Sequence, residues 1–322
     1  MKLFSDWNKP RVIKKGKRLT WGILRFLILA ALSVIILYPV YYSLSIALRP
    51  ANELYDPLVV LVPRTLTLEN IKNAIEYLNL PVALWKSIVL VLVSALLQIV
   101  SCSLAGYGLA RYSFKGKGLI FALVVLVIVV PPQTVIIPNY MQFRFFDPLG
   151  LVSLFNLITG QHTAVNLIDT NWAFYLPAAF GVGIRSGLII FIFRQFFRGM
   201  PKELEEAAYI DGCGALRTFL RIMVPSAGGA FLTTFLFSVV WYWNDYVYSS
   251  SYLSNTETVM NQLYRLKDNM SHIMEYELNA SPYQGILLLQ AGVLLAIAPL
   301  LILYVCLQKH FTESIEQSGI VG

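Results

Sequence analysis

Six apolar runs, each long enough to cross a lipid bilayer, constrain this chain more than any other feature of its sequence. An α-helix rises 1.5 Å per residue, so about 20 apolar residues span the hydrocarbon core of a membrane. We therefore predict an all-α integral membrane protein with six transmembrane helices. The six runs are Trp21–Leu48, Leu84–Leu109, Leu119–Pro138, Trp172–Phe197, Pro225–Tyr248 and Ile286–Leu307.

The charge content agrees with this prediction. Charged residues make up 13% of the chain and hydrophobic residues 57%, whereas soluble domains average about 25% charged residues. The net charge of +7 would suit a nucleic-acid-binding protein. However, most Lys and Arg residues lie beside apolar runs, where they determine the orientation of a membrane protein. The pattern therefore indicates a lipid bilayer and argues against nucleic acid as a partner.

The orientation follows from the distribution of these basic residues. A basic tail precedes the first run, which is too long for a signal-peptide core of roughly 7–15 residues and lacks a small-x-small cleavage site after it. Positive-inside weighting places both termini in the cytoplasm, and six crossings are consistent with that. The predicted cytoplasmic charges are Lys9, Arg11, Lys14, Lys15, Lys17 and Arg18 of the tail, Arg111, Lys115 and Lys117 of one loop, and Arg194, Arg198, Lys202, Arg217 and Arg221 of another.

The predicted organisation has three parts. Residues 1–20 form the basic cytoplasmic tail, residues 21–308 the six-helix transmembrane domain with a cytoplasmic loop at 194–224, and residues 309–322 a cytoplasmic C-terminal tail. Three segments, near 49–83, 139–171 and 249–285, lie outside, and none is long enough for a soluble domain of ordinary size. In the first of them, Thr67-Leu68-Glu69-Asn70 predicts a helix start before an apolar-periodic stretch through Tyr77.

The cytoplasmic loop contains an unusual polar stretch, PKELEEAAYIDGCGALRTFLRIMVP, at Pro201–Pro225. Pro201 suits a first helical position, and acidic residues at 203, 205 and 206 oppose the positive end of a helix dipole. Ala207 and Ala208 form helices without bulk, so another protein can approach closely. Asp211-Gly212 then breaks the helix, because Gly212 accepts a left-handed conformation. The pattern predicts a second helix from about Gly214, closed by Pro225, with an apolar side formed by Leu216, Phe219, Leu220 and Met223 and with Arg217 and Arg221 together.

An interfacial amphipathic helix would explain the basic residues of this stretch but not its acidic first turn, small residues and Asp-Gly break. Glu206-Ala207-Ala208-x-x-Asp211-Gly212, followed by Ile222-x-x-Pro225, resembles the EAA motif of ABC-importer permeases. The resemblance is to the six-helix, maltose-transporter-like carbohydrate permeases, and it implies the type I ABC-importer (MetI-like) fold. It extends over most of the chain through Ala105–Gly116, Phe193–Phe197, Trp243-Asn244-Asp245 and the C-terminal tail.

The resemblance also implies a mechanism and a set of partners. Such permeases lie in the bacterial cell membrane, pair with a second permease, receive sugar from an extracellular or periplasmic solute-binding protein, and sit on a dimer of cytoplasmic ATPases that bind ATP and Mg. The EAA helix inserts into a groove of one ATPase. By this resemblance, Glu206 makes the charged contact, Ala207 and Ala208 allow close seating, and Asp211-Gly212 sets the turn. The chain itself then needs no cofactor.

A second group of candidates concerns the path of the solute. Arg185 lies near the middle of the fourth run, and a charge there costs about 2.5–3.5 kcal/mol on insertion scales, so it should face protein or water. It either donates to a polar solute or pairs with Asp245. Trp243, Asn244 and Asp245 end the fifth run, where they either line the path of a sugar or belong to the interfacial aromatic belt. The outer segment at 249–285 is, by the resemblance, a candidate to reach into the binding protein.

Several other functions are disfavoured by the sequence. The chain has no G-x-x-x-x-G-K-[ST] phosphate loop, so ATP hydrolysis must come from partner chains. Its three Cys and three His residues are scattered without metal-ligand spacing. An ion-coupled secondary transporter is the alternative function, but it would need acidic residues within the spans, which are poor in them. The sequence departs from the family pattern at Lys86-Ser87, where many relatives carry Asn-Ser or Asn-Thr, and this weakens any transfer of substrate identity.

Overall fold

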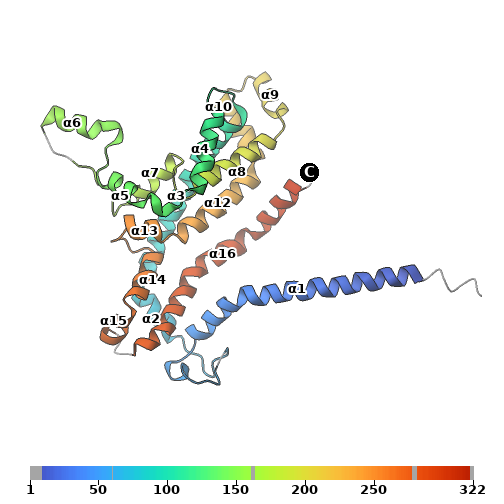
Figure 1. The fold of residues 1–322 in the computed structure, drawn as a ribbon, viewed down its shortest axis with the longest axis vertical. Helices are drawn as coiled ribbons and strands as arrows, with labels where there is room; N and C mark the ends of the chain where they lie inside the picture. The colour runs from blue at the N-terminus through green and yellow to red at the C-terminus, as the bar shows by residue number, and fades with distance from the viewer. Residues whose placement is uncertain (1–8, 60, 161–163, 278–280, 320–322) are drawn as a thin grey trace, which may run out of the picture. The chain divides into compact units, whose positions relative to one another are not determined.

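The computed structural model describes residues 9–59, 61–160, 164–277 and 281–319 of the chain. Within these ranges the structure is helical (Figure 1), with no β-strand and a single isolated bridge between Phe146 and Val165. The chain divides into two compact units, one of residues 1–75 and 269–295 and the other of residues 76–268 and 296–322. Two helices, α2 (Glu69–Tyr77) and α16 (Gly285–Gly319), have residues in both units.

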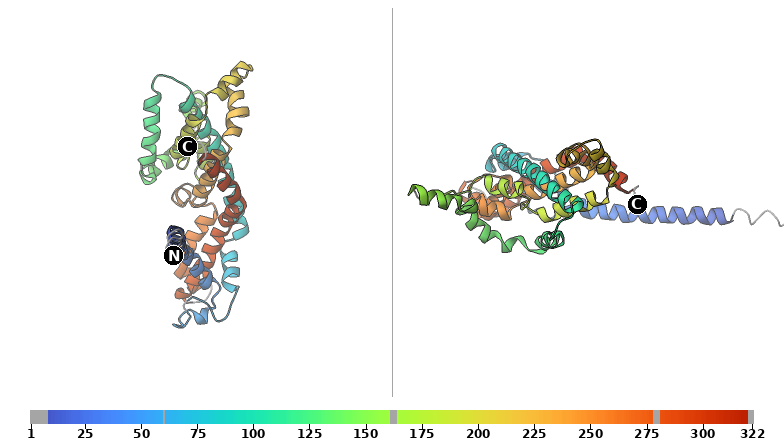
Figure 2. Two further views of the ribbon diagram at one scale, coloured as in Figure 1. Left: turned by 90° about the vertical axis from the view of Figure 1, so that its right-hand side faces the viewer. Right: turned by 90° about the horizontal axis from the view of Figure 1, so that it is seen from above.

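The first unit is built on α1 (Lys9–Ala47), a long apolar helix that Figure 2 shows as a single rod. Most of its side chains from Trp21 to Leu44 are exposed, so the surface that α1 presents is apolar. Such a surface fits lipid or a partner helix. A short connection containing the 3-10 turn Ala51–Glu53 follows, and α15 (Met270–His272) also belongs to this unit.

The connection after α1 is ordered by two polar side chains. The carboxylate of Glu53 accepts hydrogen bonds from the Arg64 and Thr65 backbone N–H groups (2.8 and 3.0 Å) and from the Thr65 hydroxyl (2.6 Å). These donors stabilise the charged form and lower the pKa of Glu53 below its ordinary value. Asn70 donates to the carbonyls of Ala47 and Arg49 (3.0 and 2.8 Å). Helix α2 begins at Glu69 and ends at Tyr77, which confirms the helix predicted there.

The second unit is organised around α3 (Leu80–Arg111), which packs along α7 (Trp172–Ala179), α8 (Ser186–Gly199) and α12 (Gly228–Trp243). Figure 1 shows these helices bundled together, with α4 (Lys117–Val129) against α8. The smaller helices of the unit are α5 (Ile136–Arg144), α6 (Leu151–Thr159), α9 (Glu203–Ile210), α10 (Ala215–Thr218), α11 (Val224–Ser226), α13 (Val247–Tyr252) and α14 (Val259–Asp268).

The backbones of α3 and α8 approach closely at Gly106. A Cβ atom built there would lie 2.6 Å from the Phe193 Cβ and 3.0 Å from the Arg194 backbone nitrogen. Only glycine permits this approach, in keeping with the small residues that bring helices together in membranes. The fully buried rings of Phe193 and Phe197 stack with centroids 6.0 Å apart and belong to a buried hydrophobic cluster.

The helices differ from the six uninterrupted spans that the sequence predicts. Three described helical stretches are long and apolar enough to cross a membrane: Trp21–Ala47, Leu80–Arg111 and Gly285–Lys309. A fourth crossing is possible through a pair bent by 80°, Ala215–Ser226 with Gly228–Trp243. The all-helical membrane fold is therefore confirmed, whereas the count of six crossings stays a prediction.

Proline and glycine account for the interruptions. The third predicted run becomes α4, which ends at Val129 just before Pro131-Pro132. The fourth run is broken between α7 and α8, where Gly181 and Arg185 have positive φ angles of 71° and 54°. Pro225 does not end a helix as predicted, because it lies in the first turn of α11, where its missing N–H costs little, and the bend falls at Ala227 instead.

Candidate functional site: a docking helix and a solute-path region

The polar stretch after α8 forms a short helix and a sharp turn, as the sequence predicts. Helix α9 spans Glu203–Ile210, and its first turn is acidic. Asp211 is the C-cap that follows the helix, and Gly212 takes the left-handed conformation with φ of 77°. The Gly212 and Cys213 backbone N–H groups donate back to the carbonyls of Tyr209 and Ala208 (3.0 and 2.9 Å). Asp211-Gly212 therefore forms the turn that redirects the chain toward α10.

The two faces of α9 have different environments. Glu206, Ala207 and Ile210 are exposed, and Ile210 is exposed over 86% of its surface. Glu205 and Ala208, on the other face, are 8% and 2% exposed. Ala208 therefore packs inside its own chain, so Ala207 is the only one of the predicted pair that is presented outward. Ile210 was not singled out in the sequence, although its position three residues after Ala207 places it on the same helical face.

Buried Glu205 fastens α9 to the end of α3. The Tyr107 hydroxyl donates a 2.5 Å hydrogen bond to Glu205 Oε1, and Arg111 Nε lies 3.2 Å from Glu205 Oε2. The Arg111 and Glu205 side chains are only 7% and 10% exposed. Arg111 Nη2 also donates to the Met200 carbonyl at 2.9 Å, which fixes the chain just before α9. We call Tyr107, Arg111 and Glu205 the clamp.

The clamp was missed by sequence reasoning, which assigned all three acidic residues of α9 to the helix dipole. Glu205 and Arg111 are 94 residues apart, so no local pattern relates them. One signal was present in the sequence. Glu205 lies three residues before Ala208, and an aligned helical face that carries both a carboxylate and a small residue suits close packing on a neighbouring helix.

The segment after the turn is helical but not uniformly amphipathic. Helix α10 begins at Ala215 and continues into a π-helical turn at Phe219–Met223. Phe219 and Met223 are buried, as predicted, whereas Leu216 and Leu220 are 65% and 55% exposed. The expected apolar side is therefore divided into buried and exposed residues.

Charged side chains line a cavity beside α9. A cavity of about 540 Å³ lies between α9 and the ends of α3 and α8. Its lining includes Lys117, Arg198 and Lys202 as well as Glu206. Arg111 and Glu205 line the cavity too, but they form an ion pair with each other. A surface that fits this region therefore needs acidic groups for Lys117, Arg198 and Lys202 and a basic group for Glu206.

The predicted solute-path residues lie apart from α9, between α7 and α13. Arg185 precedes α8 in the left-handed conformation, is exposed, and holds its guanidinium carbon 5.1 Å from the centre of the Trp241 ring. This contact is a cation–π interaction. The pairing of Arg185 with Asp245, one of the two predicted alternatives, is not formed. The Asp245 carboxylate instead accepts from the Tyr248 and Ser249 backbone N–H groups (3.3 and 2.8 Å) at the start of α13.

Trp243 and Asn244 also make contacts within the chain. The Trp243 side chain is 6% exposed, and its indole N–H donates to the Ala296 carbonyl at 3.0 Å, which fastens α12 to α16. Asn244 is exposed, and its side-chain amide donates to the Val240 carbonyl at 3.0 Å. Of the four predicted solute-path residues, Arg185 and Asn244 are thus exposed, whereas Trp243 and Asp245 satisfy internal groups.

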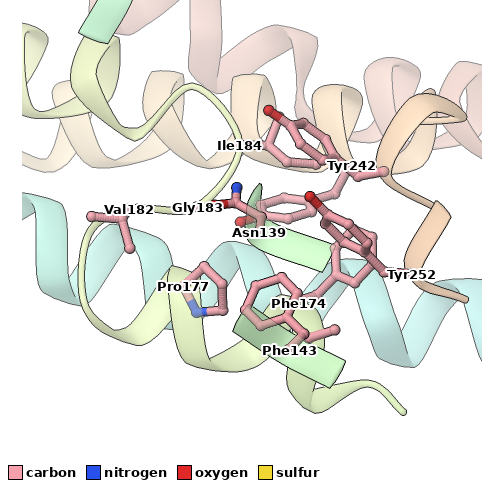
Figure 3. Close-up of a pocket in the computed structure, with 11 residues that line it drawn as sticks. Asn139, Phe143, Phe174, Pro177, Val182, Gly183, Ile184, Tyr242 and Tyr252 are labelled. Carbon is pink, nitrogen blue, oxygen red and sulfur yellow. The ribbon is translucent and has the colours of Figure 1, made fainter. Parts of the chain in front are cut away.

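A cavity adjoins the break between α7 and α8 (Figure 3). Its volume is about 50 Å³, and Figure 3 shows aromatic side chains around it, including those of Phe174, Tyr242 and Tyr252. Pockets that hold small molecules enclose roughly 300–1,000 Å³. The cavity therefore has room for a few water molecules but not for a sugar.

Lys86 and Ser87, the departure from the family pattern, hold α14 against α3. Lys86 Nζ lies 3.0 Å from Glu257 Oε2, and the Ser87 hydroxyl accepts a 2.9 Å hydrogen bond from the Val259 backbone N–H. Ser87 is buried and the Lys86 side chain is 42% exposed. Among the residues that the structure describes, no cluster of three or more His, Cys, Asp or Glu residues could hold a metal ion.

The structure combines long apolar helices with a short helix, α9, that has an exposed polar side. Residues 102–317 match the family described as "Binding-protein-dependent transport system inner membrane component". Because the match covers most of the chain, the protein belongs to this family. It is thus an inner membrane component of an ABC transport system and not the ATPase.

Individual relatives and a solved structure agree with this assignment. The chain is 28% identical over 317 residues to the arabinooligosaccharides transport system permease protein AraQ of Halalkalibacterium halodurans, covering 95% of this chain and 100% of that protein. It is 28% identical to the melibiose/raffinose/stachyose import permease protein MelC of Bacillus subtilis, covering 88% and 91%. A bacterial ABC transporter involved in the import of the acidic polysaccharide alginate shares the fold, with a TM-score of 0.70, 18% identity, and coverage of 97% of this chain and 100% of that one.

Proposed function

We propose that this chain is the permease subunit of a sugar or oligosaccharide importer and that α9 is the helix on which a partner ATPase docks. The exposed side of α9 carries this proposal. Glu206, Ala207 and Ile210 form one outward face with a charge, a small residue and a large apolar residue. An exposed apolar side chain rimmed by charges is typical of a protein interface.

Support for the substrate class comes from the relatives. The names of AraQ and MelC describe import of arabinooligosaccharides and of melibiose, raffinose and stachyose. The relatives differ in the sugar that their names give, so we propose a sugar or oligosaccharide as the substrate class without choosing one. The 50 Å³ cavity is too small for such a ligand, and we propose that the pathway forms between this chain and a second permease. Arg185 and Asn244 are the exposed candidates to line it.

The proposed topology has six crossings with both termini in the cytoplasm and α9 on the cytoplasmic side. In this arrangement α4, and α7 with α8, supply the third and fourth crossings although each is interrupted. Broken helices at membrane depth are tolerated where the freed backbone groups find partners inside the protein. At this break the Gln98 side chain donates to the Ile184 carbonyl and the Ser101 hydroxyl to the Ala178 carbonyl (2.7 and 2.6 Å).

The docking proposal is tested by charge reversal at Glu206. Glu206→Arg should release the ATPase from the purified membrane complex, because it replaces a carboxylate with a further cation beside Lys117, Arg198 and Lys202. Co-purification of the ATPase with the tagged permease measures this release. The matched control is Glu76→Arg, which reverses an exposed carboxylate of α2 outside the loop. Equal ATPase recovery from Glu206→Arg and from the unmodified chain would contradict the docking role of α9.

A further inference from the structure

We propose that the clamp formed by Tyr107, Arg111 and Glu205 transmits the movement of α9 to α3 and thereby couples ATP hydrolysis to transport. In this proposal Glu205 is a positioning residue that does not touch the ATPase. The inference rests on the proposed docking of α9. It adds the route by which a displacement of that short helix reaches the membrane helices.

The geometry shows why α9 needs such an attachment. A helix of eight residues has few backbone contacts of its own, and isolated helices of this length are unstable in water. Glu205 and Ala208 are the buried residues of α9. Ala208 contributes a methyl group, whereas Glu205 contributes two charged oxygens held from two directions by Tyr107 and Arg111. The Glu205 carboxylate therefore makes the hydrogen bond and the ion pair that hold α9 on the end of α3.

Burial makes this attachment stiff. The hydrogen bond from Tyr107 is accepted by an ionised carboxylate, and such bonds are shorter and stronger than neutral ones. Solvent screens the ion pair of Arg111 and Glu205 only weakly, because both side chains are 10% exposed or less. The Tyr107 ring is itself fixed by aromatic neighbours, with centroids 5.4 Å from Phe197 and 4.9 Å from Phe219. A force on Glu205 is therefore resisted by the packed end of α3 and not absorbed by a flexible side chain.

Helix α3 is placed to distribute the movement. It packs along α7, α8 and α12, the other main helices of its unit. Its backbone touches α8 at Gly106, one residue before Tyr107. Close-packed helices with so little free space shift as rigid bodies and do not deform gradually. A displacement of the clamp therefore moves α3 and α8 together.

The test uses the smallest changes that disconnect the clamp. Tyr107→Phe removes one hydroxyl, and Glu205→Gln removes the charge while keeping the size of the side chain. We expect both variants to co-purify with the ATPase at unmodified levels and to hydrolyse ATP. Sugar taken up per ATP hydrolysed, measured on the assembled complex in proteoliposomes, should fall about tenfold, the factor that corresponds to losing one charged hydrogen bond. The control is Glu76→Gln, which makes the same change as Glu205→Gln at an exposed carboxylate of α2 and should leave the ratio unchanged.

Two results would overturn the inference. One is an unchanged ratio of uptake to hydrolysis in fully assembled Tyr107→Phe and Glu205→Gln complexes. The other is failure of both variants to assemble, since the clamp would then serve folding and not transmission. Failure of the docking proposal is detected separately, because it appears as normal ATPase recovery with Glu206→Arg whatever the clamp variants do.

Discussion

The close approach of α3 and α8 at Gly106 gives the sharpest test of the helix packing. In Gly106→Ala the new Cβ would lie 2.6 Å from the Phe193 Cβ, 3.0 Å from the Arg194 backbone nitrogen and 3.2 Å from the Ile190 carbonyl oxygen. Two of these atoms belong to the backbone, and the third is fixed to it. The strain therefore cannot be relieved by a rotamer change, and one helix must move.

The expected size of the effect follows from two opposing contributions. Overpacking of a well-packed core costs about 1–3 kcal/mol, whereas Gly to Ala in a helix interior gains up to about 1 kcal/mol. The chain offers a matched control two residues away, because Gly108 lies in the same helix and a Cβ there meets nothing within 4 Å. Gly108→Ala should therefore gain only the helix-propensity contribution. The free energies of unfolding of the two variants should differ by about 1–3 kcal/mol.

Thermal unfolding in detergent, followed by tryptophan fluorescence, measures this difference. We expect Gly106→Ala to melt below the unmodified protein and Gly108→Ala to melt at or above it. The comparison cancels effects of the detergent and of alanine itself. If the two variants melt at the same temperature, α3 and α8 do not touch at Gly106, and the rigid coupling proposed between these helices is wrong.

Two further predictions concern polar groups that stabilise the fold. Trp243→Phe removes the hydrogen bond to the buried Ala296 carbonyl and should lower the free energy of unfolding by about 1–3 kcal/mol. Trp172→Phe changes a residue that is 57% exposed and should lower it much less. The melting temperatures of the two variants test this difference. The second concerns pH: because the pKa of folded Glu53 is lowered, its contribution to stability is complete above the unfolded pKa of about 4.3 and is lost as pH falls through the folded value. Glu53→Gln should therefore lower the melting temperature at neutral pH. As the pH falls from 7 to about 3, the melting temperature of this variant should decrease less than that of the unmodified chain. Equal decreases in the two sets of melting curves would refute the prediction.

The sequence predicted the helix and the turn at residues 203–212 closely because their determinants are local. An acidic first turn, two alanines and Asp211-Gly212 specify a helix and its end without reference to the rest of the chain. The start of α2 was predicted for the same reason. What the local pattern did not contain was the direction of each side chain relative to α3. Sequence reasoning therefore assigned Ala208 to the partner surface and did not distinguish Glu205 from its neighbours.

The spans were harder to predict because apolar content alone does not determine helical continuity. Pro131-Pro132 shortens one run, and the glycines near Arg185 interrupt another, although both runs are long enough to cross a membrane. The solute-path residues show a related limit. The sequence makes Trp243 a candidate sugar-binding aromatic residue, but in the structure its indole N–H donates to the carbonyl of Ala296, 53 residues away. Long-range hydrogen bonds of this kind have no sequence signature.

The most direct test of the account is uptake by the reconstituted complex of this chain with its second permease, ATPase and binding protein. We predict that proteoliposomes accumulate radiolabelled oligosaccharide only with ATP on the ATPase side and binding protein on the other side. A protonophore should leave this uptake unchanged. Glu206→Arg should abolish the uptake, whereas Glu76→Arg should not. Uptake that persists without ATP and collapses with the protonophore would contradict the account and indicate an ion-coupled transporter.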